Sequence, residues 1–315
     1  MTYLVKNMRN SSLLLFLIAA VCFLSCDDVI NVDTGTADPV LNIDAWVNNK
    51  TETQTIYITL SQDYFDNENL PPAATGASVF IQDNRDNTYV FTEDLTTNDG
   101  AYRWEPAAGK VLGQTGVRYT LTVVYKGETF TSSCTMGRVP TIDSIRFSKE
   151  DDIGFGNSTD RYQGEFWAKD LPGKGDTYWI RTYKNGILLN KVSEMNIAYD
   201  AAMSSGNGFD GVTFITPVRT GVNANDEDED GQRLSPLKTG DSIYVEIHSL
   251  TEISFNYMNE VITQTDRNGG LSELFTSTPL ANVSTNVVNL NGNGSAVVGF
   301  FNVAAVSGRG KKFIN

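Results

Sequence analysis

The chain has 315 residues, of which 38 are acidic and 24 basic, giving a net charge of −14, and it contains a single histidine. This acidity argues against nucleic acid and anionic lipid headgroups as partners, because proteins bind both through basic patches. A single histidine excludes zinc sites built on histidine pairs. We expect no cofactor. The length of the chain allows two domains.

The first 26 residues have the layout of a secretory signal peptide. Lys6 and Arg9 give a basic start, an uncharged apolar run spans Leu13–Leu24, and the small Ser25 precedes Cys26. The apolar run is too short for a transmembrane helix, which needs about 20 residues. We therefore expect this segment to direct export and to be removed.

The end of that segment, Phe23–Cys26, resembles a bacterial lipobox, in which the cysteine becomes the diacylated N-terminus of the mature protein. Two acyl chains hold a protein stably at a membrane. We expect lipidation at Cys26, with membrane lipid as the partner of its acyl chains, followed by a polar tether over residues 27–38. Cys134 is then the only cysteine besides the lipidated one, and we expect it to be a buried strand residue.

From residue 40 onward, apolar and polar residues alternate in short runs separated by turn signals. Such alternation places one face of each strand in a core and the other in water. Strands in this number within about 100 residues predict an immunoglobulin-like or transthyretin-like β-sandwich, which we assign to residues 39–138. The runs are Leu41–Val47, Ile56–Leu60, Val79–Ile81, Tyr89–Phe91, Tyr102–Trp104, Tyr119–Val123 and one beginning at Phe130.

A boundary is expected at Val139–Pro140, and residues 139–315 form the second predicted domain. Asn185–Gly186 between apolar runs predicts a hairpin, because both residues accept positive φ. The fold class is thus all-β, with two tandem sandwich-like domains. The predicted strands of the second are Ile142–Phe147, Gln163–Ala168, Tyr178–Tyr183, Ile187–Leu189, Ile243–Ile247, Val283–Leu290 and Ala296–Val306.

One helix is expected in the second domain, over about Thr251–Thr265. Phe255, Met258 and Ile262 recur at spacings of three and four, which is the period of an apolar helix face. Ser249 with Glu252 predicts a capping box at its start, and Asn268–Gly270 predicts its end. We expect this helix to pack on the second sheet.

Short motifs along the chain together resemble a known family. They are Leu60–Ser61, Gly76–Val79, Asp99–Tyr102, Tyr119–Leu121 followed by Gly127, Val139–Ile145, the helix after His248–Leu250, Ser284–Val287 and Gly299–Phe301. In this order they resemble the Bacteroidota lipoprotein family catalogued as "domain of unknown function 4249", over nearly all of the mature chain. Ala296–Val298 interrupts the family's last motif. The resemblance implies an envelope lipoprotein, of a kind often encoded beside TonB-dependent outer-membrane transporters, and it transfers no catalytic residue.

The acidic run Asp226–Gly231 matches the start of a calcium-binding loop. Calcium prefers oxygen ligands at alternating positions, here Asp226, Asp228 and Asp230, with a bidentate Glu at the twelfth position. That position is Leu237, and no helix pattern flanks the run. We therefore expect a solvated acidic loop and no metal site.

Other candidate sites have structural explanations that we prefer. Ser235–Lys238 and Lys238–Gly240 match two motifs of penicillin-recognising enzymes, but they share one lysine, so we regard the match as accidental. The only triad histidine would be His248, for which we expect a packing role. Ser144 and Ser242, each between an aspartate and an isoleucine, match a weak O-glycosylation pattern and also read as strand starts.

Four tryptophans, Trp46, Trp104, Trp167 and Trp179, could stack on sugars, but we expect them in the core. The leading functional hypothesis is a non-enzymatic outer-membrane lipoprotein of the cell envelope, on its periplasmic or surface-exposed face. It would be an accessory or binding protein for a TonB-dependent transporter. A structural or adhesive surface module and a carboxylate-based hydrolase are the alternatives.

Overall fold

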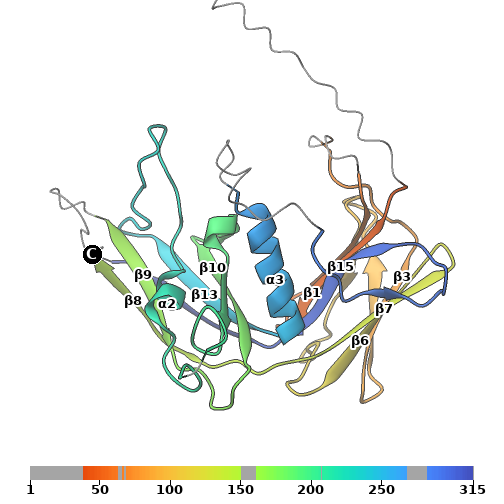
Figure 1. The fold of residues 1–315 in the computed structure, drawn as a ribbon, viewed down its shortest axis with the longest axis horizontal. Coiled ribbons are helices and arrows are strands. Elements are labelled where there is room, and N and C mark those ends of the chain that lie inside the picture. Colours follow the sequence, from red (N-terminus) through yellow and green to blue (C-terminus); the bar gives the residue numbers. More distant parts are fainter. Residues whose placement is uncertain are drawn as a thin grey trace, which may run out of the picture. The chain divides into compact units, whose positions relative to one another are not determined.

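The structure, a computed structural model, describes residues 38–62, 66, 69–149, 161–206, 208–267 and 282–314. The signal segment, Cys26, all of the tether but Asp38, and the predicted helix end at Asn268–Gly270 lie outside the described residues. The described residues from Pro39 onward belong to one compact unit. Its strands confirm the all-β prediction (Figure 1).

The first sheet has nine strands in the described part of the chain, in the order β14-β7-β6-β3-β4-β5-β2-β1-β15. Strands β1 to β7 reproduce the predicted alternation: Ile43, Ala45 and Val47 of β1 are at most 1% exposed, while the residues between them face outward. The strands are β1 Leu41–Asn48, β2 Gln54–Leu60, β3 Ser78–Asp83, β4 Thr88–Glu93, β5 Ala101–Trp104, β6 Arg118–Tyr125, β7 Glu128–Thr135, β14 Val288–Asn289 and β15 Val297–Ala304.

Strands β14 and β15 come from the C-terminal region, although the sequence division at Val139–Pro140 places them with the second half. Strand β15 pairs in parallel with β1 along its whole length, from Leu41 opposite Val297 onward, and β14 pairs with β7. The first sheet is therefore completed by residues from the end of the chain. The division into two domains stays a prediction, as does the likeness to immunoglobulin or transthyretin domains.

The first sheet folds over on itself around one apolar core, so that its two ends approach each other. The amide of Val303 in β15 donates a hydrogen bond to the sulfur of Cys134 in β7, at 3.2 Å. Cys134 is free and buried, as the sequence predicts, and burial raises the pKa of its thiol to about 12. A thiol that stays protonated is a poor nucleophile, so Cys134 serves packing.

The second sheet has the order β11-β10-β13-β16, with β12 paired to β10, and β8 and β9 form a separate hairpin. Asn185 and Gly186, both with positive φ, join β10 to β11 and confirm the predicted hairpin. The elements are β8 Ile142–Lys149, β9 Tyr162–Ala168, β10 Thr177–Lys184, β11 Ile187–Leu188, η1 Val192–Glu194, β12 Asn196–Tyr199, α2 Thr216–Thr220, β13 Ser242–Leu250 and β16 Val306–Lys312.

The last predicted strand, Ala296–Val306, is divided between the two sheets. Strand β15 ends at Ala304 in the first sheet, and β16 begins at Val306 in the second. The amide of Ala305, between them, donates to the hydroxyl of Ser249 in β13, at 2.8 Å. One continuous segment thus ties the two sheets together.

Helix α3, Glu252–Thr265, confirms the predicted helix, but its N-cap differs from the prediction. The cap is Thr251, whose side chain accepts a hydrogen bond from the amide of Ser254. Ser249 still belongs to β13 and binds Ala305, so it cannot form the expected capping box. Figure 1 shows α3 packed beside the second sheet and close to β1 and β15. None of the described helices is long and apolar enough to cross a membrane.

Candidate functional site

A cavity of about 360 Å³ opens where α3 and the second sheet meet the outer face of β1 and β15. This volume lies near the lower end of the range for small-molecule sites. The lining residues are Asn42, Asp44, Trp46, Trp179, Met195, Tyr257, Met258, Val261, Gly299 and Phe300, and we call this site the junction pocket.

Strand alternation explains how β1 builds one wall of the junction pocket. Because Ile43 and Ala45 face the core of the first sheet, Asn42, Asp44 and Trp46 face the opposite way. On β15, Phe300 is paired with Asp44 and shares its face.

Gly299 allows β15 to lie this close to β1. Its φ is +104°, a backbone conformation that residues with a Cβ rarely adopt, and a Cβ there would lie 2.1 Å from the carbonyl oxygen of Ile43. The glycine of the Gly299–Phe301 motif therefore has a structural cause, and it places Phe300 in the pocket wall.

Four aromatic rings form most of the wall. The Phe300 ring contacts Trp46, at 5.7 Å and 14°, and Tyr257 of α3, at 4.3 Å and 28°, measured between ring centroids and planes, and Trp46 and Tyr257 also contact each other, at 6.0 Å and 35°. Trp179 of β10 meets Trp46 edge-on, at 5.7 Å and 73°. The pocket wall thus has three mutually contacting rings and a fourth, Trp179, that is roughly perpendicular to Trp46.

All four tryptophans are half-buried. The expected core packing holds for Trp104, against the core of the first sheet, and for Trp46 and Trp179, against a small cluster around Phe255 and Met258, but not for Trp167. Trp46 and Trp179 line the junction pocket. Trp104 packs edge-on against Tyr89. Trp167 carries two guanidinium groups over its ring, those of Arg146 at 4.2 Å and Arg219 at 4.0 Å. The outward face of β1 at Trp46 is covered by α3, which alternation alone does not reveal.

Asp44 is the only carboxylate among the residues that line the junction pocket. Desolvation raises the pKa of this carboxyl above its ordinary value, although a hydrogen bond from Trp46 opposes the rise. The residue nevertheless remains exposed to solvent. Asp44 lines the junction pocket, and no ion-pair partner of it occurs among the described residues.

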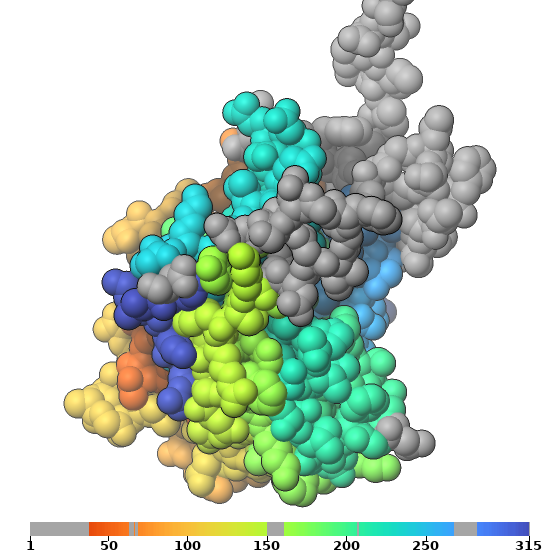
Figure 2. All heavy atoms as spheres, turned by 90° about the vertical axis from the view of Figure 1, so that its left-hand side faces the viewer, coloured from red at the N-terminus to blue at the C-terminus, as the bar shows by residue number. Residues whose placement is uncertain are grey.

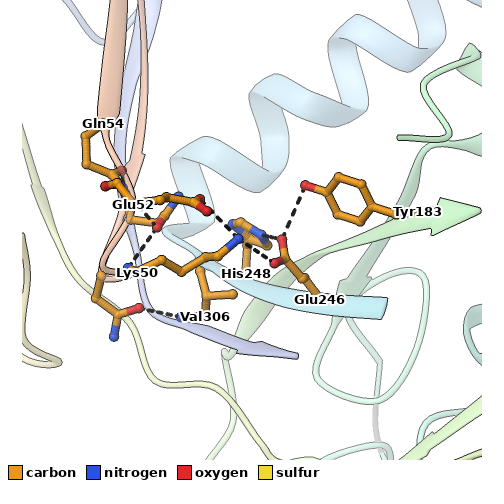
Figure 3. A network of polar contacts seen from close by, with 9 residues as sticks. Lys50, Glu52, Gln54, Tyr183, Glu246, His248 and Val306 are labelled. Carbon is orange, nitrogen blue, oxygen red and sulfur yellow. Dashed lines mark hydrogen bonds and ion pairs between the residues drawn. The ribbon is translucent and has the colours of Figure 1, made fainter. Parts of the chain in front are cut away.

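A buried polar network borders the junction pocket (Figure 3). Glu246 of β13 is 1% exposed and accepts hydrogen bonds from the Lys50 ammonium, at 2.7 Å, and from His248 Nε2, at 2.9 Å. Because an ionised carboxylate only accepts, the Nε2 of His248 carries the proton. His248 also lies against Trp179, its neighbour across β10 and β13. We call Lys50, Glu246 and His248 the junction network.

Electrostatics fix the charge states of the junction network. Burial acts to raise the pKa of Glu246, but the hydrogen bonds and charges of His248 and Lys50 outweigh it and lower this pKa to about 2. Burial lowers the pKa of His248 below its ordinary value, against the pull of Glu246. At neutral pH the network therefore holds one ion pair and one neutral imidazole.

The residues of the acidic run take part in a hairpin, which projects from the rest of the fold in Figures 1 and 2 (turquoise). Asp226 pairs with Lys191 at 2.6 Å. The Asp228 carboxylate accepts hydrogen bonds from the backbone amides of Asp230 and Gln232. In the part of the chain that the structure describes, no three His, Cys, Asp or Glu side chains gather as a metal site would require.

The two candidate glycosylation residues are half-buried. Ser144 lies within β8, and Ser242 begins β13, where its amide donates to the side-chain oxygen of Asn185 at 2.9 Å. Both positions agree with strand starts, and neither contributes to the junction pocket.

Comparison with known proteins gives a match to a family model described as "Domain of unknown function (DUF4249)", over residues 27–309. No curated protein matches the chain. The matched range begins directly after Cys26 and includes every residue of the junction pocket and the junction network.

Proposed function

The chain belongs to this family, the domain of unknown function DUF4249, and from that premise we propose that it is a membrane-anchored binding protein of the cell envelope. The proposal has two parts. One is an outer-membrane lipid anchor at Cys26, and the other is ligand binding in the junction pocket. The partner we propose is a TonB-dependent outer-membrane transporter.

The anchor rests on the first 26 residues. A basic start, a short apolar run and a small residue before Cys26 form the layout of a lipoprotein signal. The polar residues 27–38 would then span at most about 40 Å when fully extended. A tether of that reach keeps the folded part close to the membrane surface, where a transporter lies.

The junction pocket is the single observation that carries the binding function. It combines four aromatic side chains with one carboxylate in a concave site between the sheets, which is the composition of a small-molecule site. A purely structural or adhesive module has no need of such a cavity. A carboxylate-based hydrolase needs a pair of carboxyl groups, whereas the lining of this pocket supplies only Asp44.

Co-purification from the envelope tests the proposed partner. The full-length protein, tagged at its C-terminus, would be extracted in mild detergent and its partners identified by mass spectrometry. We expect one TonB-dependent transporter to be recovered in near-stoichiometric yield. The control carries residues 1–38 of this chain fused to an unrelated domain, so it shares the membrane but lacks the pocket. Equal recovery of the transporter with this control would contradict the proposal.

A further inference from the structure

The junction pocket, if it is a binding site as proposed above, also indicates the class of its ligand. We propose that it binds a small organic cation, whose ammonium or quaternary ammonium group lies against the aromatic rings with Asp44 as its counter-ion. This inference depends on the proposed function, because it identifies what the same site would hold.

The charge of the lining is one-sided. Asp44 contributes a carboxylate, and none of the lining residues is a lysine, arginine or histidine. Neither Lys50 of the junction network nor Arg181 lines the pocket. Lys50 is already paired with Glu246 at 2.7 Å, and Arg181 lies over the rings of Trp179 and Tyr183. An incoming cation would supply the ion-pair partner that Asp44, which has only a hydrogen bond from Trp46, lacks among the described residues.

The rings supply the second attraction. The face of an aromatic ring is electron-rich, so a cation within about 6 Å of the centroid is attracted, most strongly by tryptophan. Trp46 and Trp179 present rings at 73° to one another, and Tyr257 adds a third half-exposed ring. Rings of different orientation beside a carboxylate offer a cation contacts that a flat hydrophobic ligand does not require.

Other ligand classes fit the lining less well. An anion would be repelled by Asp44 and by the net charge of −14. A neutral sugar needs several donors as well as acceptors, but an ionised carboxylate only accepts. The amide nitrogen of Asn42 already donates to the hydroxyl of Thr59, at 3.1 Å. The donors of the lining, the two indole N–H groups and the Tyr257 hydroxyl among them, are all neutral, so the single carboxylate and the ring surface favour a cation, and the sugar is the class that the test must separate from it.

Choline and its neutral isostere 3,3-dimethylbutan-1-ol test the charge requirement, because they differ by one nitrogen-to-carbon replacement. Both would be titrated, by calorimetry and by tryptophan fluorescence, into the full-length lipidated protein in a polyoxyethylene detergent, with methyl glucopyranoside as the sugar probe. We expect choline to bind in the micromolar to millimolar range and at least tenfold more tightly than the alcohol or the sugar.

Substitution of the counter-ion tests its location. Asp44→Asn should weaken choline binding at least tenfold, while Asp143→Asn, which removes the same charge from an exposed position on β8, should leave it unchanged. Thermal unfolding checks that both variants fold. Because burial disfavours the charge of Asp44, Asp44→Asn should be at least as stable as the unsubstituted protein. Trp179→Leu should weaken binding of choline more than binding of the alcohol.

The outcomes separate the class of ligand from the proposed function. If the alcohol or the sugar binds as tightly as choline and Asp44→Asn has no effect, the proposal of a cationic ligand is wrong, although the pocket is still a binding site. Absence of binding by all three probes would also overturn the cation. The transporter co-purification would still decide the proposed function, because it does not depend on which ligand the pocket takes.

Discussion

Replacing Glu246 with alanine is expected to lower the free energy of unfolding by about 3 kcal/mol, the scale for removing one partner of a buried ion pair. Glu246 is 1% exposed and joins Lys50, in the turn after β1, to His248 on β13. Its removal would leave a buried imidazole without its acceptor and would break an ion pair that links the two sheets. Urea denaturation of the protein would measure the change.

Glu52 provides the matched control, since it pairs with the same Lys50 ammonium at 3.0 Å but is 54% exposed. Surface ion pairs contribute roughly 0–1 kcal/mol, so Glu52→Ala should cost far less than Glu246→Ala. Equal costs for the two variants would show that burial of Glu246 is not what makes the junction network stabilising.

The same network predicts how stability depends on pH. The pKa of His248 is lowered from 6.5 in the folded state, so the unfolded chain binds the extra proton and stability falls as the pH drops below about 6.5. The pKa of Glu246 is lowered from 4.5 to about 2, so stability falls further as the pH drops from 4.5 to about 2. In Glu246→Gln this second loss should be smaller, as thermal unfolding over a pH series would show.

Replacing Cys26 with alanine is expected to move the protein almost completely from the membrane to the soluble fraction. Two acyl chains anchor a protein stably, and none of the described helices could replace them as a membrane span. Fractionation followed by a detergent-free wash would measure the release. Cys22→Ala is the control, because Cys22 lies in the apolar run before the expected cleavage position and its loss should leave the protein on the membrane. Retention of Cys26→Ala after washing would refute the lipid anchor.

The local patterns in the sequence predict the elements of this fold but not their partners. Alternation identifies β1 and β15 as strands, yet nothing local indicates that Leu41 pairs with Val297. Pairing over such a distance depends on the whole core. The helix cap was misplaced for a similar reason, because the hydroxyl of Ser249 is already bonded to the amide of Ala305 from the far end of the chain.

The junction pocket was only partly predictable. Sugar stacking was considered for Trp46 and Trp179 and core packing was preferred, because alternation does not show that they line a pocket beside α3. Asp44 and Glu246 were missed, although both are acidic residues in otherwise apolar or aromatic strand contexts. The two phenylalanines Phe300–Phe301 were the clearer signal, because neighbours in a strand face opposite sides, so one of them needs a second apolar environment.

Photo-cross-linking in intact cells tests most directly the central proposal, that the protein binds its ligand or partner in the junction pocket. A benzophenone amino acid would replace Val261, which lines the pocket on α3, or Leu95, which is 77% exposed in the turn between β4 and β5. The account predicts discrete adducts, with a small molecule or the transporter, at position 261 and not at position 95. The same adducts at both positions, or none at position 261, would contradict it.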